Sequence, residues 1–361
     1  MNNRKQRQIL MLLKTLSLDI STKKKSSNSI KFICISSKSH GLRWIVPTNK
    51  RTVIHILANW TPYSFIYSII WRFLCIAIYL KISDKIPKLD YIYINDSSSL
   101  AKNITNNDNN SFVIYVGTPS SYQKLVILFF DKKSGYPNYV AKIPLTQLAK
   151  QSIKNEYKVL EYLKSSGVDS SIYPHSFENR DIGDSTCQKW LKGSPAPIHL
   201  THAHYRFIRT LINSNRLISV GETRDLTLRR YRQLVQDGCV FRREIHDSCS
   251  VLTQKKINFW LHSSVVHGDF VPWNLKITSK GTICALDWEY SKIDSLPCYD
   301  IMYYCIQVNK LLRKSLVFNS RLLNNQFYDT FAHLDNSQIE DYLSLLEVII
   351  TLDLYERNIR K

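Results

Sequence analysis

The sequence predicts an α+β chain with a small antiparallel-sheet lobe and a larger helical lobe. Three short β-branched and aromatic runs, separated by turn residues, predict an antiparallel meander over residues 112–144. Helix-period patterns follow over residues 147–167 and over most of residues 199–262. Two short strands, "SVVHGD" and "TICALDW", then precede a helical end. Because the sheet and the helices come in separate blocks, we expect two lobes with a cleft between them.

The composition is that of a globular chain with a strong positive charge. The chain has 361 residues, 44% hydrophobic content and a formal net charge of +20. This length allows a bilobed enzyme with an extra segment. Residues 1–51 hold twelve basic side chains and one acid, Asp19. Such an excess favours polyanions or anionic lipid surfaces, and a solvated basic surface is the simpler alternative.

The eight cysteines are scattered and form no C-x-x-C pair. They are interpreted as small buried hydrophobic residues in a reducing compartment, not as a disulfide or zinc framework. The apolar run at residues 9–13 is too short for a signal peptide, and Lys14 interrupts it. A cytoplasmic location is therefore expected.

The first part of the chain divides by composition. Residues 1–94 form a basic segment of unknown role, and the Asn- and Ser-rich residues 95–111 are interpreted as a linker or surface loop. Residues 63–81 are almost wholly apolar around a central Arg72. The sequence leaves a buried helix, an interfacial helix and a membrane span open, although the arginine disfavours a span. An interfacial helix with basic flanks would give peripheral contact with an anionic membrane on its cytoplasmic face.

Three polar side chains follow the two late strands. Asp269 comes directly after one apolar run, Asn274 follows five residues later, and Asp287 ends the next run. If the two strands pair, Asp269 and Asp287 emerge side by side. Converging carboxylates need a cation, and a set of oxygen ligands favours Mg²⁺ completed by substrate phosphates. The pattern therefore indicates phosphoryl transfer.

The segments "HGDFVPWN" and "ALDWE" resemble the catalytic loop and metal-binding segment of the aminoglycoside phosphotransferase and choline kinase group, which has a protein-kinase-like fold. The resemblance implies that Asp269 is the catalytic base and that Asn274 and Asp287 bind Mg²⁺. Glu289 would be a further metal ligand or a turn cap. The residues that match the family's motif but would shape the catalytic loop are His267 and Asp300.

The upstream half supplies the other elements of this group in the right order. Lys142 ends the third predicted strand and Glu156 lies on the next predicted helix, as a phosphate-binding lysine and its partner would. The resemblance places adenine contacts around Gln188 and Trp190. It covers about residues 111–350.

The nucleotide loop departs from the family pattern. It holds one glycine, Gly117, so phosphate contact is expected from the backbone and from hydroxyls such as that of Thr118. The implied organisation is a nucleotide-binding lobe at residues 112–192 and a helical catalytic and substrate lobe at residues 193–361.

The resulting hypothesis is an ATP- and Mg²⁺-dependent phosphotransferase whose acceptor is a hydroxyl of a sugar, an amino alcohol or a glycolipid. The alternatives are a kinase-fold nucleotide-binding scaffold without turnover and a basic nucleic-acid-binding protein, for which no recognised motif is present. The histidines His199, His202 and His204 are expected at an exposed helix start rather than in a metal site.

Overall fold

The computed structural model describes residues 16, 18–21, 24, 29–37, 41–48, 53, 65–80, 82, 90–95, 97–105, 110–179 and 184–359. The chain divides into two compact units. The first comprises Met1–Tyr157 and His175–Trp190, and the second comprises Lys158–Pro174 and Leu191–Lys361. Helix α5 (Gln147–Ser165) begins in the first unit and ends in the second.

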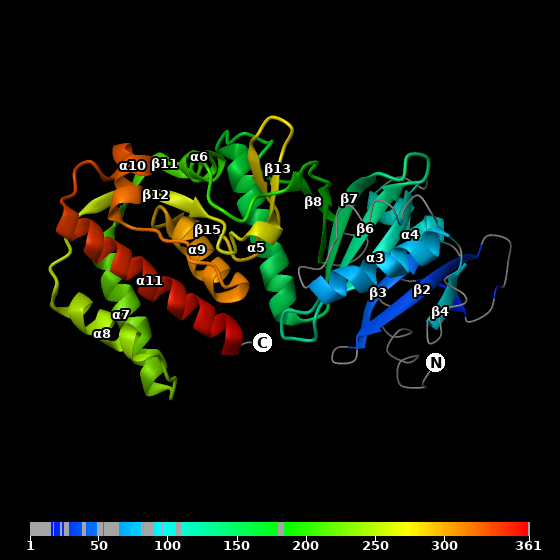
Figure 1. Cartoon of the computed structure of the whole chain (residues 1–361), viewed down its shortest axis with the longest axis horizontal. Helices are drawn as coiled ribbons and strands as arrows, with labels where there is room; N and C mark the ends of the chain where they lie inside the picture. The colour runs from blue at the N-terminus through cyan, green and yellow to red at the C-terminus, as the bar shows by residue number, and fades with distance from the viewer. Residues whose placement is uncertain are drawn as a thin grey trace. The chain divides into compact units, whose positions relative to one another are not determined.

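The first unit is built on a nine-stranded sheet of order β1-β4-β2-β3-β5-β6-β7-β9-β8 (Figure 1). Its strands are β1 (Ile20–Ser21), β2 (Ile30–Ser37), β3 (Gly41–Pro47), β4 (Asp90–Ile94), β5 (Asn110–Val116), β6 (Lys124–Asp131), β7 (Pro137–Pro144), β8 (Ser176–Asn179) and β9 (Ser185–Lys189). Every pairing in it is antiparallel. The meander predicted from three consecutive runs is confirmed, because β5, β6 and β7 pair in that order.

Both faces of this sheet are covered by apolar side chains. Successive residues of a strand point to opposite faces, so Phe112 and Val113 belong to different clusters. Helix α4 (Ser97–Thr105) contributes Leu100 and Ile104 to the cluster of Phe112. Helix α3 (Phe65–Tyr79) contributes to the cluster of Val113.

The described strands of the basic amino-terminal segment belong to the same sheet as the expected nucleotide lobe. The join is the pairing of β3 with β5, where Trp44 lies opposite Tyr115. The polar residues 95–111 carry α4 rather than an extended linker, since Leu100 and Ile104 give this short stretch a buried face.

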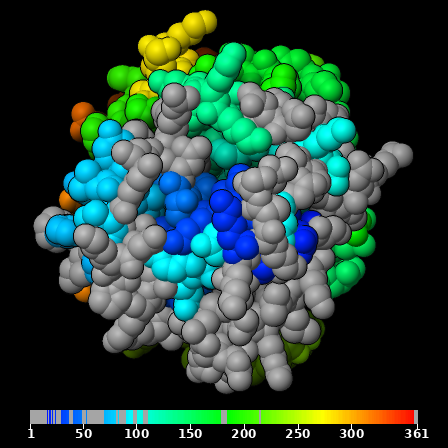
Figure 2. All heavy atoms as spheres, turned by 90° about the vertical axis from the view of Figure 1, so that its right-hand side faces the viewer, coloured from blue at the N-terminus to red at the C-terminus, as the bar shows by residue number. Residues whose placement is uncertain are grey.

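Helix α3 is apolar on both its buried and its exposed side. Trp71, Cys75 and Ile78 pack into the sheet cluster, whereas Ile70 and Phe73 are exposed. Figure 2 shows atoms of α3, in light blue, at the surface of the first unit. Among the described residues, no helix is long and apolar enough to cross a membrane.

The second unit holds two three-stranded sheets and most of the helices. The sheets have the orders β10-β13-β14 and β11-β12-β15. The strands are β10 (Ser194–Pro195), β11 (Ile212–Ser219), β12 (Trp260–Val266), β13 (Leu275–Ile277), β14 (Ile283–Ala285) and β15 (Lys292–Ser295). The helices are α6 (His202–Thr210), α7 (Val220–Gln236), α8 (Arg243–Gln254), α9 (Tyr299–Leu312), α10 (Ser320–Phe331) and α11 (Asn336–Ile359). Helix α11 runs beside α7 and α8 (Figure 1).

The predicted α+β class, with an antiparallel sheet and a helical region, is confirmed, but one predicted helix is wrong. Residues within 199–262 were expected to be mostly helical, and "INSNRLIS" instead forms β11. It pairs with β12 through Ile212 opposite Ser264 and bulges between Asn213 and Leu217. Pairing with a buried strand therefore overrides the local helical pattern.

Candidate active site

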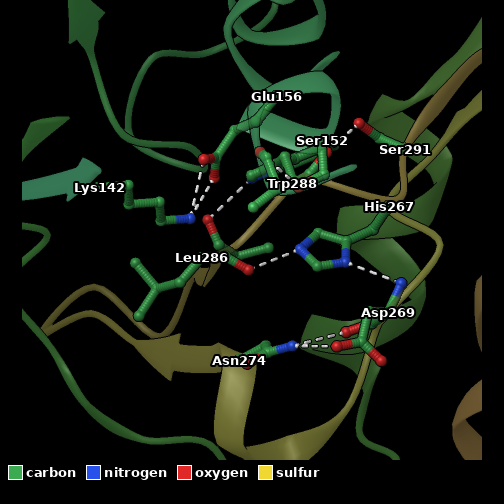
Figure 3. A network of polar contacts seen from close by, with 11 residues as sticks. Lys142, Ser152, Glu156, His267, Asp269, Asn274, Leu286, Trp288 and Ser291 are labelled. Carbon is green, nitrogen blue, oxygen red and sulfur yellow. Dashed lines mark hydrogen bonds and ion pairs between the residues drawn. The ribbon is translucent and has the colours of Figure 1, made fainter. Parts of the chain in front are cut away.

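The predicted catalytic loop closes on itself through one amide. Asn274 ends a 3₁₀ turn, Pro272–Asn274, that lies between β12 and β13. Its Nδ2 donates to Oδ2 of Asp269 at 2.8 Å and to the Asp269 carbonyl at 3.0 Å (Figure 3). Asp269 is partly exposed, whereas Asn274 is buried. The loop thus fixes a partly solvated carboxylate against a buried amide.

Gly268 is required by the path of this loop. Its φ is +76°, in the left-handed region, and an added Cβ would lie 2.2 Å from the carbonyl oxygen of Tyr290. A residue with a side chain would suffer both backbone strain and a clash. The glycine beside Asp269 therefore allows the loop to pass close to the backbone at Tyr290.

His267 links the predicted catalytic loop to the segment before Asp287. Its Nδ1 accepts from the N–H of Asp269 at 3.2 Å, so Nε2 carries the proton and donates to the Leu286 carbonyl at 2.7 Å (Figure 3). The ring is fully buried and packs against Trp288, at a centroid distance of 4.7 Å. These contacts are those of a residue that joins two loops.

Asp300 holds the other side of the same loop. Lying in the first turn of α9, it accepts from the N–H of His267 at 2.7 Å and from the N–H of Gly268 at 2.9 Å. Burial raises the pKa of this carboxyl, and the hydrogen bonds and His267 oppose that shift. Two buried backbone donors thus depend on one side chain.

Asp287 reaches the same end of the unit by a different pairing from the one expected. The strand before Asp269, β12, pairs with β11 and β15, so the expected pairing with the strand before Asp287 is wrong. That strand, β14, pairs instead with β13, which begins directly after Asn274. Accordingly the Leu286 N–H donates to the Asn274 carbonyl at 2.8 Å. The hairpin therefore brings Asp287 to Asn274, and the short turn brings Asn274 to Asp269.

The side-chain oxygens of Asn274, Asp287 and Glu289 fit a cation for which the protein would supply only part of the ligands. The Asn274 amide nitrogen donates to Asp269, so the side-chain oxygen of Asn274 is its candidate ligand atom for a cation. Asp287 and Glu289 are partly exposed, and Asp287 has a φ of +66°. Within the described ranges, no group of three or more His, Cys, Asp or Glu side chains could hold a metal ion. Carboxylate and amide oxygens without a full cage suit Mg²⁺.

Seven of the eight cysteines are buried, as the sequence predicts. All eight cysteines carry free thiols, and all except the half-buried Cys239 are buried. Burial raises the pKa of Cys187 to about 12, which keeps this thiol protonated.

In the first unit, Lys142 and Glu156 form a buried ion pair. Lys142 lies on β7 and Glu156 on α5, and the ammonium contacts both carboxylate oxygens at 2.7 and 2.8 Å (Figure 3). Their exposed fractions are 5% and 0%. The sequence order of strand lysine and helix glutamate is therefore matched by direct contact.

The loop between β5 and β6 holds the other nucleotide candidates of the first unit. The Gly117 N–H donates to the Lys124 carbonyl at 2.9 Å, and a Cβ at Gly117 would lie 2.8 Å from that oxygen. The Thr118 hydroxyl accepts from Nη1 of Arg43 at 3.0 Å. Arg43 belongs to β3, so the basic segment contributes a cation to this loop that sequence reasoning missed.

Gln188 and Trp190 lie at and just after the end of β9. Gln188 is buried, and its Nε2 has no protein hydrogen-bond partner among the described residues. The Trp190 N–H donates to the Asn138 carbonyl at 2.8 Å, which pins the segment to β7.

Three further residues were not predicted correctly from the sequence: the exposure of His204 was predicted wrongly, and Tyr303 and Arg357 were not predicted as site residues. His204 is fully buried, so its expected exposed position is wrong: its Nδ1 caps the start of α6 by accepting from the Thr201 N–H. Tyr303 donates to Oδ1 of Asp269 at 2.8 Å, and Arg357 donates to the Gly268 carbonyl at 2.7 Å. Tyr303 could have been found one helical turn after Asp300, whereas no local signal indicates Arg357.

Comparison with solved structures shows the same kind of protein repeatedly. A streptomycin–ATP–APH(2")-IIa ternary complex is 15% identical, covers 72% of this chain and 91% of its own, and gives a TM-score of 0.46. The chain is similar to small-molecule phosphotransferases. A type I macrolide 2'-phosphotransferase gives 13% identity, coverage of 68% and 85%, and a TM-score of 0.48. For choline kinase LicA from Streptococcus pneumoniae the values are 15%, 64% and 82%, and 0.40.

No protein-family model matches the chain, and the comparison with curated proteins gives no match. At sequence identities of 13% to 15%, the similarity to small-molecule phosphotransferases does not show which substrate this chain uses.

Proposed function

We propose that the chain is a phosphotransferase that moves the γ-phosphate of ATP to a hydroxyl group of a small molecule. The observation that carries the proposal is the contact of Asn274 with the Asp269 carboxylate, 2.8 Å, together with the hairpin that brings Asp287 to Asn274. A carboxylate, an amide and a second carboxylate at one loop cluster are the groups that phosphoryl transfer requires.

Asp269 is the base in the proposed reaction. The acceptor hydroxyl forms a bond from its oxygen to the γ-phosphorus, its proton passes to the Asp269 carboxylate, and the bond to the bridging oxygen of ADP breaks. Asp269 suits this role because its carboxylate is held by hydrogen bonds yet remains partly exposed.

Asn274 and Asp287, with Glu289 as a further candidate, would hold Mg²⁺. When bound, the ion neutralises charge on the β- and γ-phosphates. His267 and Asp300 would act indirectly, since their contacts fix the backbone on either side of Asp269.

The nucleotide would use residues of the first unit. Lys142 would bind phosphate oxygens while Glu156 orients the ammonium. Gly117 and Thr118 would approach the phosphates, and Gln188 and Trp190 would contact the base. We assign nucleotide binding to residues 112–192 and the catalytic and acceptor region to residues 193–361, with residues 95–111 as the segment before them.

The acceptor class is a sugar, an amino alcohol or a glycolipid headgroup. Within this class the net charge of +20 disfavours cationic amino alcohols, which need an acidic pocket, and favours neutral or anionic sugars and glycolipid headgroups.

A screen of these acceptors with γ-labelled ATP and Mg²⁺ tests the proposal. Wild type should label at least one acceptor, Asp287→Ala should label none, and Asp294→Ala should label as well as wild type. Asp294 is a matched control because its carboxylate pairs with Arg216 on the surface of β15. If no acceptor is labelled and ATP does not bind, the proposal fails.

Two other functions make different predictions in that screen. A kinase-fold scaffold binds ATP without Mg²⁺-dependent consumption. A nucleic-acid-binding protein labels no acceptor. Its affinity for nucleic acid, measured separately, falls steeply with salt concentration and is unchanged in Asp269→Ala.

We also propose that α3 contacts an anionic membrane surface. Its exposed side chains include Ile70, Phe73 and Ile76, with Arg72 exposed among them and no acidic residue on the helix. A helix that packs one apolar face on its own sheet and exposes another suits a lipid interface, and the arginine suits anionic headgroups. The cytoplasmic leaflet supplies such headgroups.

Vesicle sedimentation tests this contact. The full chain should sediment with phosphatidylglycerol vesicles more than with phosphatidylcholine vesicles, and Phe73→Ser should reduce the bound fraction. Tyr328→Ser is the matched control, since Tyr328 on α10 is 67% exposed and Phe73 is 74% exposed. Equal loss in both variants, or no sedimentation of wild type, contradicts the contact.

A further inference from the structure

Two residues that are far from the catalytic loop in sequence form hydrogen bonds with Asp269 and its neighbour Gly268. Tyr303, on α9, donates its hydroxyl proton to Oδ1 of Asp269 at 2.8 Å. Arg357, near the end of α11, donates from Nη1 to the Tyr303 hydroxyl at 3.3 Å and to the Gly268 carbonyl at 2.7 Å. All four groups belong to the second unit. The catalytic loop is therefore in contact with the last helix of the chain.

The direction of these hydrogen bonds is fixed by chemistry. A guanidinium can only donate, so the Tyr303 oxygen accepts from Arg357 and its own proton points to Asp269. Burial, together with the charge of Asp269, raises the pKa of Tyr303 well above its usual range. The phenol thus stays protonated and remains a donor over the whole working pH range.

Packing holds both side chains in place. Tyr303 is 3% exposed and stacks on Tyr299 at a centroid distance of 6.1 Å. The Arg357 guanidinium lies 4.2 Å from the ring centroid of Tyr290, whose carbonyl closes on Gly268. A stacked guanidinium is restricted in orientation, so its hydrogen bonds are restricted as well.

Both oxygens of the Asp269 carboxylate are consequently engaged from different sides. Oδ2 accepts from Asn274 at 2.8 Å and Oδ1 accepts from Tyr303 at the same distance. Two donors on two oxygens fix the plane of a carboxylate, which a single donor leaves free to rotate. Fixed geometry at the proton acceptor is worth large rate factors in catalysis.

We propose that Tyr303 and Arg357 are positioning residues that hold the Asp269 carboxylate in the orientation from which it accepts the proton of the acceptor hydroxyl. This role rests on the phosphotransferase function proposed above. It makes α11 a structural part of the active site, although its sequence carries no catalytic motif.

The first test compares two tyrosine variants of α9 in Mg²⁺-dependent ATP turnover. Tyr303→Phe removes only the hydroxyl, and kcat should fall about 10- to 100-fold while KM for ATP changes less than about twofold. Tyr299→Phe is the matched control, because Tyr299 is buried on the same helix and its hydroxyl donates to Asp353 instead. It should leave kcat within about twofold of wild type. Equal effects of both variants on kcat, or an unchanged kcat in Tyr303→Phe, would overturn the proposal.

A double variant tests whether the two residues act in series. If Arg357 works by orienting Tyr303, adding Arg357→Met to Tyr303→Phe should lower kcat by less than about threefold beyond the single change. If kcat of the double variant falls by the product of the two single-variant factors, Arg357 acts independently of Tyr303. That result would contradict the claim that Arg357 acts by orienting Tyr303.

Crystal structures of wild type and Tyr303→Phe give a readout that needs no turnover. The Asp269 carboxylate should leave its position in the variant while the backbone of the loop stays. An unmoved carboxylate overturns the positioning role. Absence of ATP turnover in wild type would instead refute the phosphotransferase function, so the two failures are distinguishable.

Discussion

Both carboxylate oxygens of Glu156 accept hydrogen bonds from Nζ of Lys142, although the residues lie 14 positions apart on a strand and a helix. The pair is almost fully buried. A buried ion pair contributes little net stability, but removal of one partner leaves an uncompensated charge in the interior. The pair is therefore sensitive to changes that remove only one charge.

Glu156→Gln should lower the free energy of unfolding by about 3 kcal/mol and weaken ATP binding, because the Lys142 ammonium loses its ion pair with the Glu156 carboxylate. Urea unfolding and calorimetric titration with ATP measure the two effects. Glu161→Gln on the same helix is the control, because its ion pair with Lys164 is 3.6 Å long and exposed. Equal destabilisation by both variants would contradict the assigned role.

Gly268→Ala should cost at least about 3 kcal/mol of stability and abolish activity, because strain at positive φ adds to a clash. The clash is the 2.2 Å approach of the new Cβ to the Tyr290 carbonyl. Gly281→Ala has a similar φ, +74°, with no atom within 4 Å. We expect it to cost about 1 kcal/mol and to keep activity. Thermal unfolding of both variants decides the matter.

His204 should make stability depend on pH. Burial lowers the pKa of His204 from 6.5 to about 4, with a smaller contribution from His199. The folded state thus prefers the neutral ring, so its stability is fully present above pH 6.5 and is lost as pH falls towards 4. The full loss is about 3 kcal/mol.

Urea unfolding between pH 4.5 and 7.5 measures this dependence. The decrease towards low pH should be smaller in His204→Gln than in wild type. His202→Gln, an exposed position in the same helical turn, should retain the wild-type decrease. An identical pH profile for wild type and His204→Gln would be the contrary result.

Asp300→Asn should loosen the catalytic loop. An amide has one acceptor oxygen, so the His267 N–H or the Gly268 N–H loses its partner at a cost of about 2 kcal/mol. Hydrogen exchange at the Gly268 amide should accelerate in this variant and stay slow in Asp294→Asn. Unchanged protection of Gly268 would argue against the role of Asp300.

Local patterns were sufficient for the elements that carry their own signal. The meander β5 to β7 and the order of Lys142 and Glu156 follow from short alternating runs and one amphipathic helix, because these pairings join neighbours in sequence. The grouping of Asp269, Asn274 and Asp287 could be predicted, but the strand pairing that produces it could not. A three-residue strand, β13, carries too little pattern to be recognised.

Long-range contacts explain the remaining differences. β11 is a strand because β12 is available beside it, which its own sequence does not reveal. Arg43 reaches Thr118 and Arg357 reaches Gly268 across separations of 75 and 89 residues. No periodicity in one sequence encodes contacts of that range, so the supporting residues of the site emerge only from the fold.

The most direct measurement is Mg²⁺-dependent transfer of the γ-phosphate from ATP by wild type and by Asp269→Asn. The substitution keeps the size of the side chain and removes the base. We expect wild type to transfer phosphate only with Mg²⁺, and the variant to bind ATP with similar affinity while its kcat falls at least about 100-fold. Equal transfer by the two proteins, or none by either, would contradict the assignment of Asp269 as the catalytic base of a phosphotransferase.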